Sequence, residues 1–368
     1  MDFSFTEEQE TVGKVARQLF EHRATPEHLS DLEAGEIRHD DALWRELAAS
    51  DLLGIALPES VGGSGGDFLE LCVLLAEVGW SVAPVPVYAT LVLGADAIAR
   101  HGDSALHQRY LPKVVSGELF LTAALSEANN SDPTSPRTTA RAEGDNTWIL
   151  TGSKELVPAA QLADAIVVSA RADDGPGLFV VDATAEGVTV TTAGTTNGEP
   201  YADVELAGVA GRRLDGGSSA VAELYNRALV GLCAMQVGVA ERALKIAASY
   251  TSEREQFGRP IGSFQAVQQR LADAFIDVEA IRWTTWHAAW LIAEGRPAVR
   301  EAAIAKFWAA EAGARVVASA QQVHGGMGID ITYPLHRYFL WAKQIELSLG
   351  SAPQQLARLG AAYPEGIK

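Results

Sequence analysis

The residues best suited to hold a phosphate lie in the last third of the chain. Arg254 stands two positions before Gln256, and the segment continues as Phe257-Gly258-Arg259-Pro260. A guanidinium beside Gly and Pro can make two parallel hydrogen bonds to a pyrophosphate, and Phe257 offers an apolar surface next to it. These residues could therefore bind an anionic phosphate group, but taken alone they fit a solvated turn between two helices better.

A second candidate binding segment contains adjacent glycines. Gln322 is followed by His324, Gly325 and Gly326. Glycines without a side chain let a ligand approach the backbone closely, and they also commonly end helices. Because His324 stands at the expected helix end, we predict a capping or packing role for it rather than acid–base chemistry.

The elements that position these residues follow a simple order. Residues 6–9 read as a helical capping box. Apolar residues recur at helical spacing in the first third of the chain, alternate as short strands in the middle, and return to helical spacing up to the end. We expect an α+β protein with three domains, at residues 1–118, 119–215 and 216–368. Expected helices lie at residues 41–53, 68–78, 88–100, 218–252, 264–294 and 298–324, and expected strands at residues 120–125, 147–150, 166–168, 178–181 and 188–190.

Composition narrows the class of function. The chain has 368 residues and a net charge of −18, so its average surface repels nucleic acid, whereas a local arginine can still bind a small anion. Cys72 and Cys233 are expected to be buried free thiols, because neither has a neighbouring Cys or His at metal-ligand spacing. No secretory signal is recognisable, and the longest apolar run is too short to cross a bilayer. We expect a cytoplasmic protein without a metal, nucleic-acid or membrane partner.

Four stretches, spread over nearly the whole chain, resemble the acyl-CoA dehydrogenase family; they are residues 57–65, 110–118, 252–261 and 322–329. The resemblance implies an N-terminal helical domain, a small middle β-barrel or sandwich, and a C-terminal four-helix bundle. It also implies FAD as cofactor. In this family the last two segments reach across a dimer interface to the flavin of the neighbouring subunit. The residues carried over as cofactor contacts are Arg254, Gln256, Phe257, Gln322, Gly325 and Gly326.

The segments with which family members hold their own flavin differ here. The family loop reads approximately Thr-Glu-Pro-Gly-x-Gly-Ser-Asp, but residues 126–132 lack the proline and both glycines, while Ser126 keeps a hydroxyl for the substrate. A second family segment places Trp and Thr beside the flavin ring after Gly-x-Lys. Here Gly152-Ser153-Lys154 is followed by no aromatic residue. The flavin cradle of this chain is therefore expected to be weakened.

The catalytic base is also missing. Family members abstract the substrate α-proton with a glutamate, either near the C-terminus or on the first long C-terminal-domain helix. The corresponding positions here hold Leu349 and Asn226, neither of which accepts a proton. Three other carboxylates remain as alternatives for a relocated base: Glu127, Glu223 and Glu346.

These matches and losses imply a division of labour. The chain keeps the segments that contact a neighbouring subunit's flavin, and it lacks the flavin cradle and the catalytic base of its own site. We therefore expect an α2β2 enzyme whose homologous partner subunit carries the catalytic glutamate. The resemblance is to actinobacterial heteromeric enzymes that desaturate steroid side-chain acyl-CoA thioesters and pass electrons to an electron-transfer flavoprotein or similar acceptor. Three alternatives stay open: a homotetramer with a relocated base, a non-catalytic scaffold, and a flavin monooxygenase on the same fold.

Overall fold

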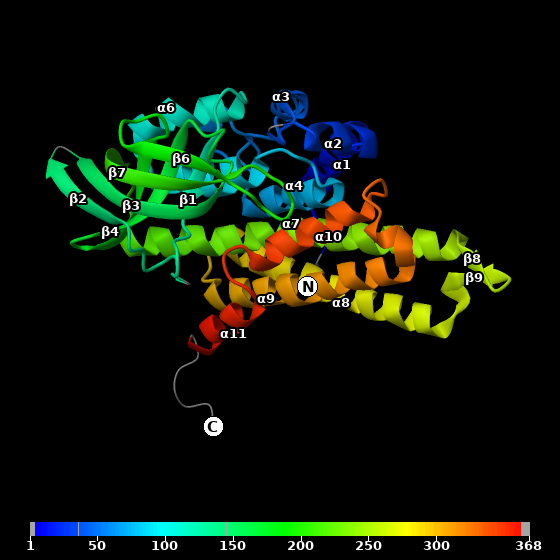
Figure 1. Cartoon of the computed structure of the whole chain (residues 1–368). Helices are drawn as coiled ribbons and strands as arrows, with labels where there is room; N and C mark the ends of the chain where they lie inside the picture. The colour runs from blue at the N-terminus through cyan, green and yellow to red at the C-terminus, as the bar shows by residue number, and fades with distance from the viewer. Residues whose placement is uncertain (1–3, 36, 131, 145, 362–368) are drawn as a thin grey trace. The chain divides into compact units, whose positions relative to one another are not determined.

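The computed structural model describes residues 4–35, 37–130, 132–144 and 146–361. Helices, then strands, then helices follow along the chain as predicted (Figure 1). The capping box is confirmed, because the Gln9 N–H donates to Thr6 Oγ1 at 3.2 Å and the Thr6 N–H to Gln9 Oε1 at 3.0 Å. The helices of the first part are α1 (Glu7–Arg23), α2 (Pro26–Glu33), α3 (Asp41–Ala49), η1 (Glu59–Val61), α4 (Phe68–Ser81), η2 (Tyr88–Ala95), α5 (Asp96–His101) and α6 (Ser104–Val115).

The middle strands close into a small barrel, as expected. Strand β4 pairs with both β2 and β5, β5 pairs with β7, and β7 returns through β3 to β2, while β1 and β6 extend the sheet. Apolar side chains of these strands, among them Leu150, Phe179 and Val204, form one buried core. The strands are β1 (Leu121–Ala124), β2 (Thr139–Gly144), β3 (Thr147–Pro158), β4 (Ala165–Ala172), β5 (Gly175–Asp182), β6 (Val188–Ala193) and β7 (Tyr201–Arg213).

Long helices dominate the last part. Helix α9 packs against α8, α10 and α11, and the hairpin of β8 and β9 joins α7 to α8 at one end of these helices (Figure 1). A side chain at Gly313 of α9 would meet the Gln236 side chain of α7 at 2.1 Å, so this glycine permits close packing. The elements are α7 (Gly217–Glu253), β8 (Glu255–Gln256), β9 (Arg259–Pro260), η3 (Ile261–Ser263), α8 (Gln265–Ala293), α9 (Val299–His324), η4 (Gly325–Ile329), α10 (Leu335–Leu347) and α11 (Ala352–Ala361).

Two compact units emerge from the tertiary contacts. One comprises residues 1–12, 32–71 and 84–228 and holds the barrel; the other comprises residues 13–31, 72–83 and 229–368 and holds the C-terminal helices. Their boundaries pass through α1, α2, α4 and α7, so they do not coincide with the expected ranges 1–118, 119–215 and 216–368. Each of the two units is therefore described by itself.

Three further expectations concern the described residues. Cys72 and Cys233 are buried free thiols, as predicted. Within residues 4–361, apart from the three internal gaps, no group of His, Cys, Asp and Glu side chains is placed to hold a metal ion. Over the same residues, no helix combines the length and the apolar character that crossing a bilayer requires.

Candidate functional site

Arg254 stands at the base of a short hairpin. Its N–H donates to the Tyr250 carbonyl at 2.9 Å, which extends the last turn of α7, and its carbonyl accepts from the Ile261 N–H at 2.8 Å, which closes the hairpin. The Arg254 side chain is exposed and forms no hydrogen bond or ion pair with any residue that the structure describes. Its backbone is therefore fixed while its guanidinium is free to bind an external anion.

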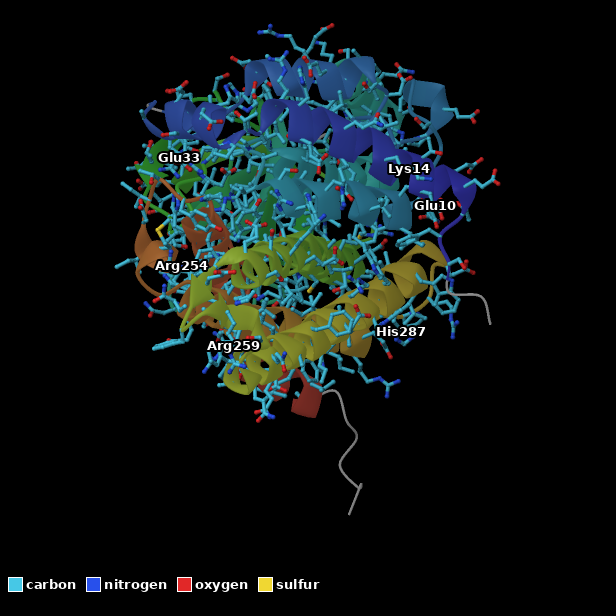
Figure 2. The ribbon with its side chains drawn as sticks, turned by 90° about the vertical axis from the view of Figure 1, so that its right-hand side faces the viewer. Glu10, Lys14, Glu33, Arg254, Arg259 and His287 are labelled. Atoms are coloured by element: carbon cyan, nitrogen blue, oxygen red, sulfur yellow. The ribbon has the colours of Figure 1, made fainter. Side chains whose placement is uncertain are left out.

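The hairpin tip presents an aromatic side chain to solvent. Phe257 and Gly258 have φ values of 56° and 77°, the left-handed pair of a tight two-residue turn. Phe257 is 92% exposed and touches Phe264 edge-on, with ring centroids 6.1 Å apart. Arg259 lies over the Phe264 ring at 4.1 Å, and Figure 2 shows Arg254 and Arg259 at this end of the C-terminal helices. The exposed Gln256 completes a surface that is both cationic and aromatic.

The glycine turn after α9 is open. Gly325 has φ +58° and ψ −131°, a conformation that favours glycine, and its N–H donates to the Gln322 carbonyl. A side chain built at Gly325 or Gly326 would meet no atom within 4 Å. Both glycines and Gln322 are exposed, so this backbone is accessible to a ligand.

His324 ties the two segments together. Its ring stacks on Tyr250 with centroids 4.2 Å apart, Nδ1 lies 2.7 Å from the Ala320 carbonyl and Nε2 lies 3.1 Å from the Tyr333 hydroxyl. Because a carbonyl only accepts, Nδ1 carries the proton and Nε2 accepts from Tyr333. Burial lowers the pKa of His324, which favours this neutral form. The predicted packing role is confirmed, and it holds the ends of α7 and α9 side by side.

In the barrel, Glu127 is engaged on both oxygens. Oε1 accepts from Lys154 Nζ at 2.8 Å and from the Thr138 N–H at 2.9 Å, and Oε2 accepts from the Arg137 N–H at 2.7 Å. Burial alone would raise the pKa of this carboxyl, but the Lys154 ammonium and the two main-chain donors lower it to about 2. Glu127 is therefore a structural anion rather than a base at neutral pH.

The loop after Glu127 closes on itself. Arg137 donates to the Asn129 carbonyl at 3.0 Å, and the Asn130 amide donates to Glu127 Oε2 at 3.2 Å. Asn129 takes φ 52° in a turn where the family has glycines. The partly exposed Ser126 hydroxyl has no hydrogen-bond partner among the described residues, so it stays available as the predicted substrate contact. Ser131 lies outside the described residues.

The strand segment after Lys154 bulges instead of presenting an aromatic ring. The pairing of β3 with β7 shifts between Lys154 and Val157. Leu156 within this bulge has φ 50° and is 47% exposed, and its N–H donates to Asp203 at 3.0 Å. An aliphatic side chain thus occupies the region where the resemblance implies a flavin platform.

The two family positions for the base contain no acid. Leu349 has φ 53° in the turn between α10 and α11. The buried Lys306 donates to the Glu346 carbonyl at 3.2 Å and the Gly350 carbonyl at 3.0 Å, and so pins that turn. Asn226 is buried within α7.

The other candidate bases have cationic partners. Glu223 pairs with His101 at 3.4 Å and with Arg100. The hydrogen bond from His101 and the nearby arginines lower the pKa of Glu223 to about 2 despite its partial burial. Glu346 forms an ion pair with Lys343. Each of these carboxylates therefore has a structural partner.

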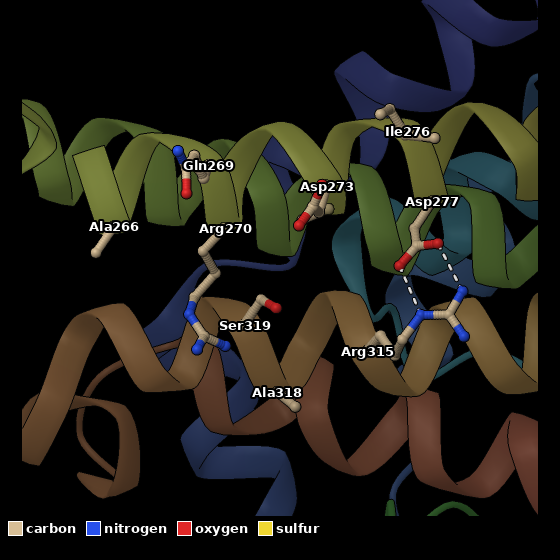
Figure 3. A pocket seen from close by; sticks show the side chains of 10 residues that line it. Ala266, Gln269, Arg270, Asp273, Ile276, Asp277, Arg315, Ala318 and Ser319 are labelled. Carbon is tan, nitrogen blue, oxygen red and sulfur yellow. Dashed lines mark hydrogen bonds and ion pairs between the residues drawn. The ribbon is translucent and has the colours of Figure 1, made fainter. Parts of the chain in front are cut away.

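A groove of about 750 Å³ runs between α8 and α9 (Figure 3). Arg315 bridges it by pairing with Asp277 at 2.6 and 2.9 Å, and Arg270 extends from α8 toward α9 near Ser319. The exposed apolar residues of α8 are Phe275, Ile276, Trp283 and Trp290. Of these, only Ile276 lines the groove.

The hairpin and the glycine turn fit the FAD expected from the resemblance. They supply a free guanidinium for a pyrophosphate, an exposed ring and an open backbone, all from one compact unit. The barrel loop after Ser126 differs, because its Glu127 and Arg137 side chains are hydrogen-bonded within the barrel.

Three family models match the chain in succession. The acyl-CoA dehydrogenase N-terminal domain matches residues 6–118, the middle domain residues 122–208 and the C-terminal domain residues 215–363. Among curated proteins, the acyl-CoA dehydrogenase FadE27 of Mycobacterium tuberculosis is 41% identical, with 99% of each chain covered.

Two solved structures are similarly close. A chain of the Tcur3481-Tcur3483 steroid ACAD variant is 46% identical with a TM-score of 0.93, over 96% of this chain and 97% of that one. A chain of the ChsE4-ChsE5 complex from Mycobacterium tuberculosis is 42% identical with a TM-score of 0.94, over 99% and 100%.

Proposed function

Because this chain belongs to the acyl-CoA dehydrogenase family, we propose that it completes the FAD site of a homologous partner subunit and carries no catalytic base of its own. The family supports an oxidoreductase acting on acyl-CoA, with FAD as cofactor. Our proposal adds that this chain supplies the segments that contact the FAD of its partner, and not those that hold a flavin and a substrate of its own.

One contrast carries the proposal. Arg254 is exposed and its side chain bonds to no other residue that the structure describes, whereas Glu127, in the loop of the chain's own cradle, is buried in an ion pair with Lys154. The exposed Arg254 guanidinium can exchange its water contacts for an external anion, whereas Glu127 is already hydrogen-bonded within the fold. Arg254 belongs to a segment that reaches a neighbour in the family, and Glu127 belongs to the loop that holds a subunit's own flavin.

The partner and substrate follow from the relatives. Tcur3481-Tcur3483 and ChsE4-ChsE5 are each named as a pair of proteins, and the first is named a steroid ACAD. We propose an α2β2 assembly that desaturates a steroid side-chain acyl-CoA at the α,β bond. An electron-transfer flavoprotein or similar acceptor would reoxidise it, in the cytoplasm. The three-domain division at residues 1–118, 119–215 and 216–368 is part of this proposal.

The contribution of this chain is binding and positioning. FAD, when bound, supplies the acceptor for the substrate hydride. Arg254 would neutralise a phosphate, Phe257 and Gln256 would contact the adjoining part, and Gln322, Gly325 and Gly326 would let the backbone approach closely. The α-proton would go to the partner's glutamate, since Leu349 and Asn226 cannot accept it.

Flavin retention tests the assignment of Arg254. In the purified complex, Arg254→Ala should weaken FAD binding by roughly ten- to a hundredfold, because one charge-assisted contact contributes about 1.5–3 kcal/mol. Flavin absorbance after dialysis measures the loss, and thermal unfolding of this chain without FAD should not change. Arg300→Ala is the matched control, since Arg300 is also exposed and has no partner among the described residues. Equal flavin retention in both variants would contradict the proposal.

The alternatives give different results in simple assays. A homotetramer with its own base would be yellow and reduce a dye acceptor when expressed alone. A scaffold would stay colourless with its partner, and a monooxygenase would consume oxygen with reduced flavin. The ion pairs of Glu127, Glu223 and Glu346 argue against the first of these.

A further inference from the structure

A cavity of about 450 Å³ lies in the second compact unit, apart from the segments assigned to the flavin. It is walled by the C-terminal half of α7, the start of α10, the start of α2 and Val82 after α4. Its volume is within the range of about 300–1,000 Å³ that is usual for small-molecule sites.

The cavity is rich in positive charge although the chain carries −18 overall. Arg242 and Lys245 from α7 and Arg337 from α10 line it, against the single carboxylate of Glu253. Neither Arg242 nor Lys245 forms an ion pair with a carboxylate among the described residues. Two cations one helical turn apart repel each other, and a bound anion would relieve that repulsion.

The Trp80 ring makes cation–π contacts with Arg242, Lys245 and Arg17. Arg242 and Lys245 each lie 5.2 Å from the centre of its ring, and Arg17 lies 4.0 Å from it. Arg17 is neutralised by Glu77 at 2.6 Å, so the charge left for a ligand belongs to the other two. The Trp80 carbonyl accepts from the Tyr338 hydroxyl at 2.9 Å, which fixes an aromatic wall of the cavity.

The remaining walls suit an organic group. Tyr250, Tyr333 and Tyr338 line the cavity together with Leu29 and Ile246. An inorganic ion would leave this apolar and aromatic surface without a contact, whereas a ring would bury it. The cavity therefore matches a ligand with an anionic end and a flat or apolar body.

We propose that this cavity binds a small phosphate monoester of nucleotide size, with its phosphate held by Arg242, Lys245 and Arg337. Tyr250 and Tyr333, which line the cavity, also hold His324, and Glu253 directly precedes Arg254. A ligand here would thus contact residues that adjoin the hairpin and the glycine turn, although neither Arg254 nor Gly325 lines the cavity.

AMP is the probe for this site, with adenosine as its uncharged counterpart. At low salt, AMP should bind saturably by titration calorimetry and inorganic phosphate should compete, whereas adenosine should not bind. The double variant Arg242→Gln with Lys245→Gln should weaken AMP at least tenfold, and Arg300→Gln should leave it within twofold. Circular dichroism confirms that both variants fold.

Three outcomes would overturn the assignment: no saturable AMP binding, unchanged binding in the double variant, or adenosine binding as tightly as AMP. Arg254→Ala separates this site from the flavin contact. It should leave AMP affinity within twofold, and a loss of AMP binding in that variant would place the ligand on the hairpin instead. The titration needs neither a partner nor activity, so its result is independent of the proposed function.

Discussion

Glu127 and Arg254 differ in their surroundings: Glu127 is hydrogen-bonded on both oxygens, whereas the Arg254 side chain is exposed and bonds to no other described residue. Glu127 lies 27 positions from Lys154 in the sequence and is bonded to it in the barrel. Nothing in the local sequence indicates that pairing, so Glu127 could be considered a base until its partners were known. Arg254 was predicted as a ligand contact because residues 252–261 resemble the family's flavin-contacting loop, and that assignment stays a prediction.

The buried pair should matter for stability and not for catalysis. Glu127→Gln leaves the fully buried Lys154 ammonium without its counter-ion, which should cost about 3–5 kcal/mol. Glu346→Gln breaks a partly exposed pair with Lys343 and should cost about 0–1 kcal/mol. Urea unfolding measures both. Equal losses in the two variants would mean that the barrel pair is not the structural element described here.

Acid should remove the contribution of Glu127 over a defined range. Its folded pKa of about 2 lies below the unfolded value of about 4.3, so the stabilisation is complete above the unfolded pKa and declines as pH falls toward the folded pKa. The difference in unfolding free energy between wild type and Glu127→Gln should therefore shrink as the pH falls from about 4 to about 2. A difference that grows on acidification would contradict this sign.

Among the elements, the long helices were the most predictable. The expected helices at 218–252, 264–294 and 298–324 match α7, α8 and α9 within about one residue at each end. Strands β2 and β7 were not expected. Both begin with alternating residues that include Gly, Arg or Glu, and their place in the barrel comes from pairing with distant strands.

In the hairpin between α7 and α8, the exposed Phe257 ring stands at a position whose backbone conformation is unfavourable for phenylalanine. Phe257 holds a left-handed conformation that Asn tolerates better, yet it is almost fully exposed. In this chain without FAD, Phe257→Asn should leave the free energy of unfolding unchanged or raise it by up to about 1 kcal/mol. In the complex, the same variant should lower flavin retention. Differential scanning fluorimetry and flavin absorbance give the two readings. Reduced stability with unchanged flavin would assign Phe257 to packing.

For the molecule as a whole, the sequence motifs predicted the family fold, which is confirmed, whereas the imbalance between the two half-sites stays a prediction. The sequence could not predict the compact units, whose boundaries cross helices that look continuous in sequence. It also gave no sign of the cavity beside Trp80. The cations of that cavity are separated by up to 95 positions and meet only through packing.

Stoichiometry tests the division of labour at this scale. If this chain completes its partner's flavin site but cradles none itself, the purified complex should hold about one FAD for every pair of chains, and this chain alone should hold none. The reason is that its barrel loop is closed by Glu127 and Arg137, while its free Arg254 lies on the segment that reaches outward in the family. Flavin absorbance combined with native mass spectrometry gives the ratio directly. One FAD per chain in the complex would show that this barrel also cradles a flavin, and would return Ser126 and Leu156 to the cofactor site.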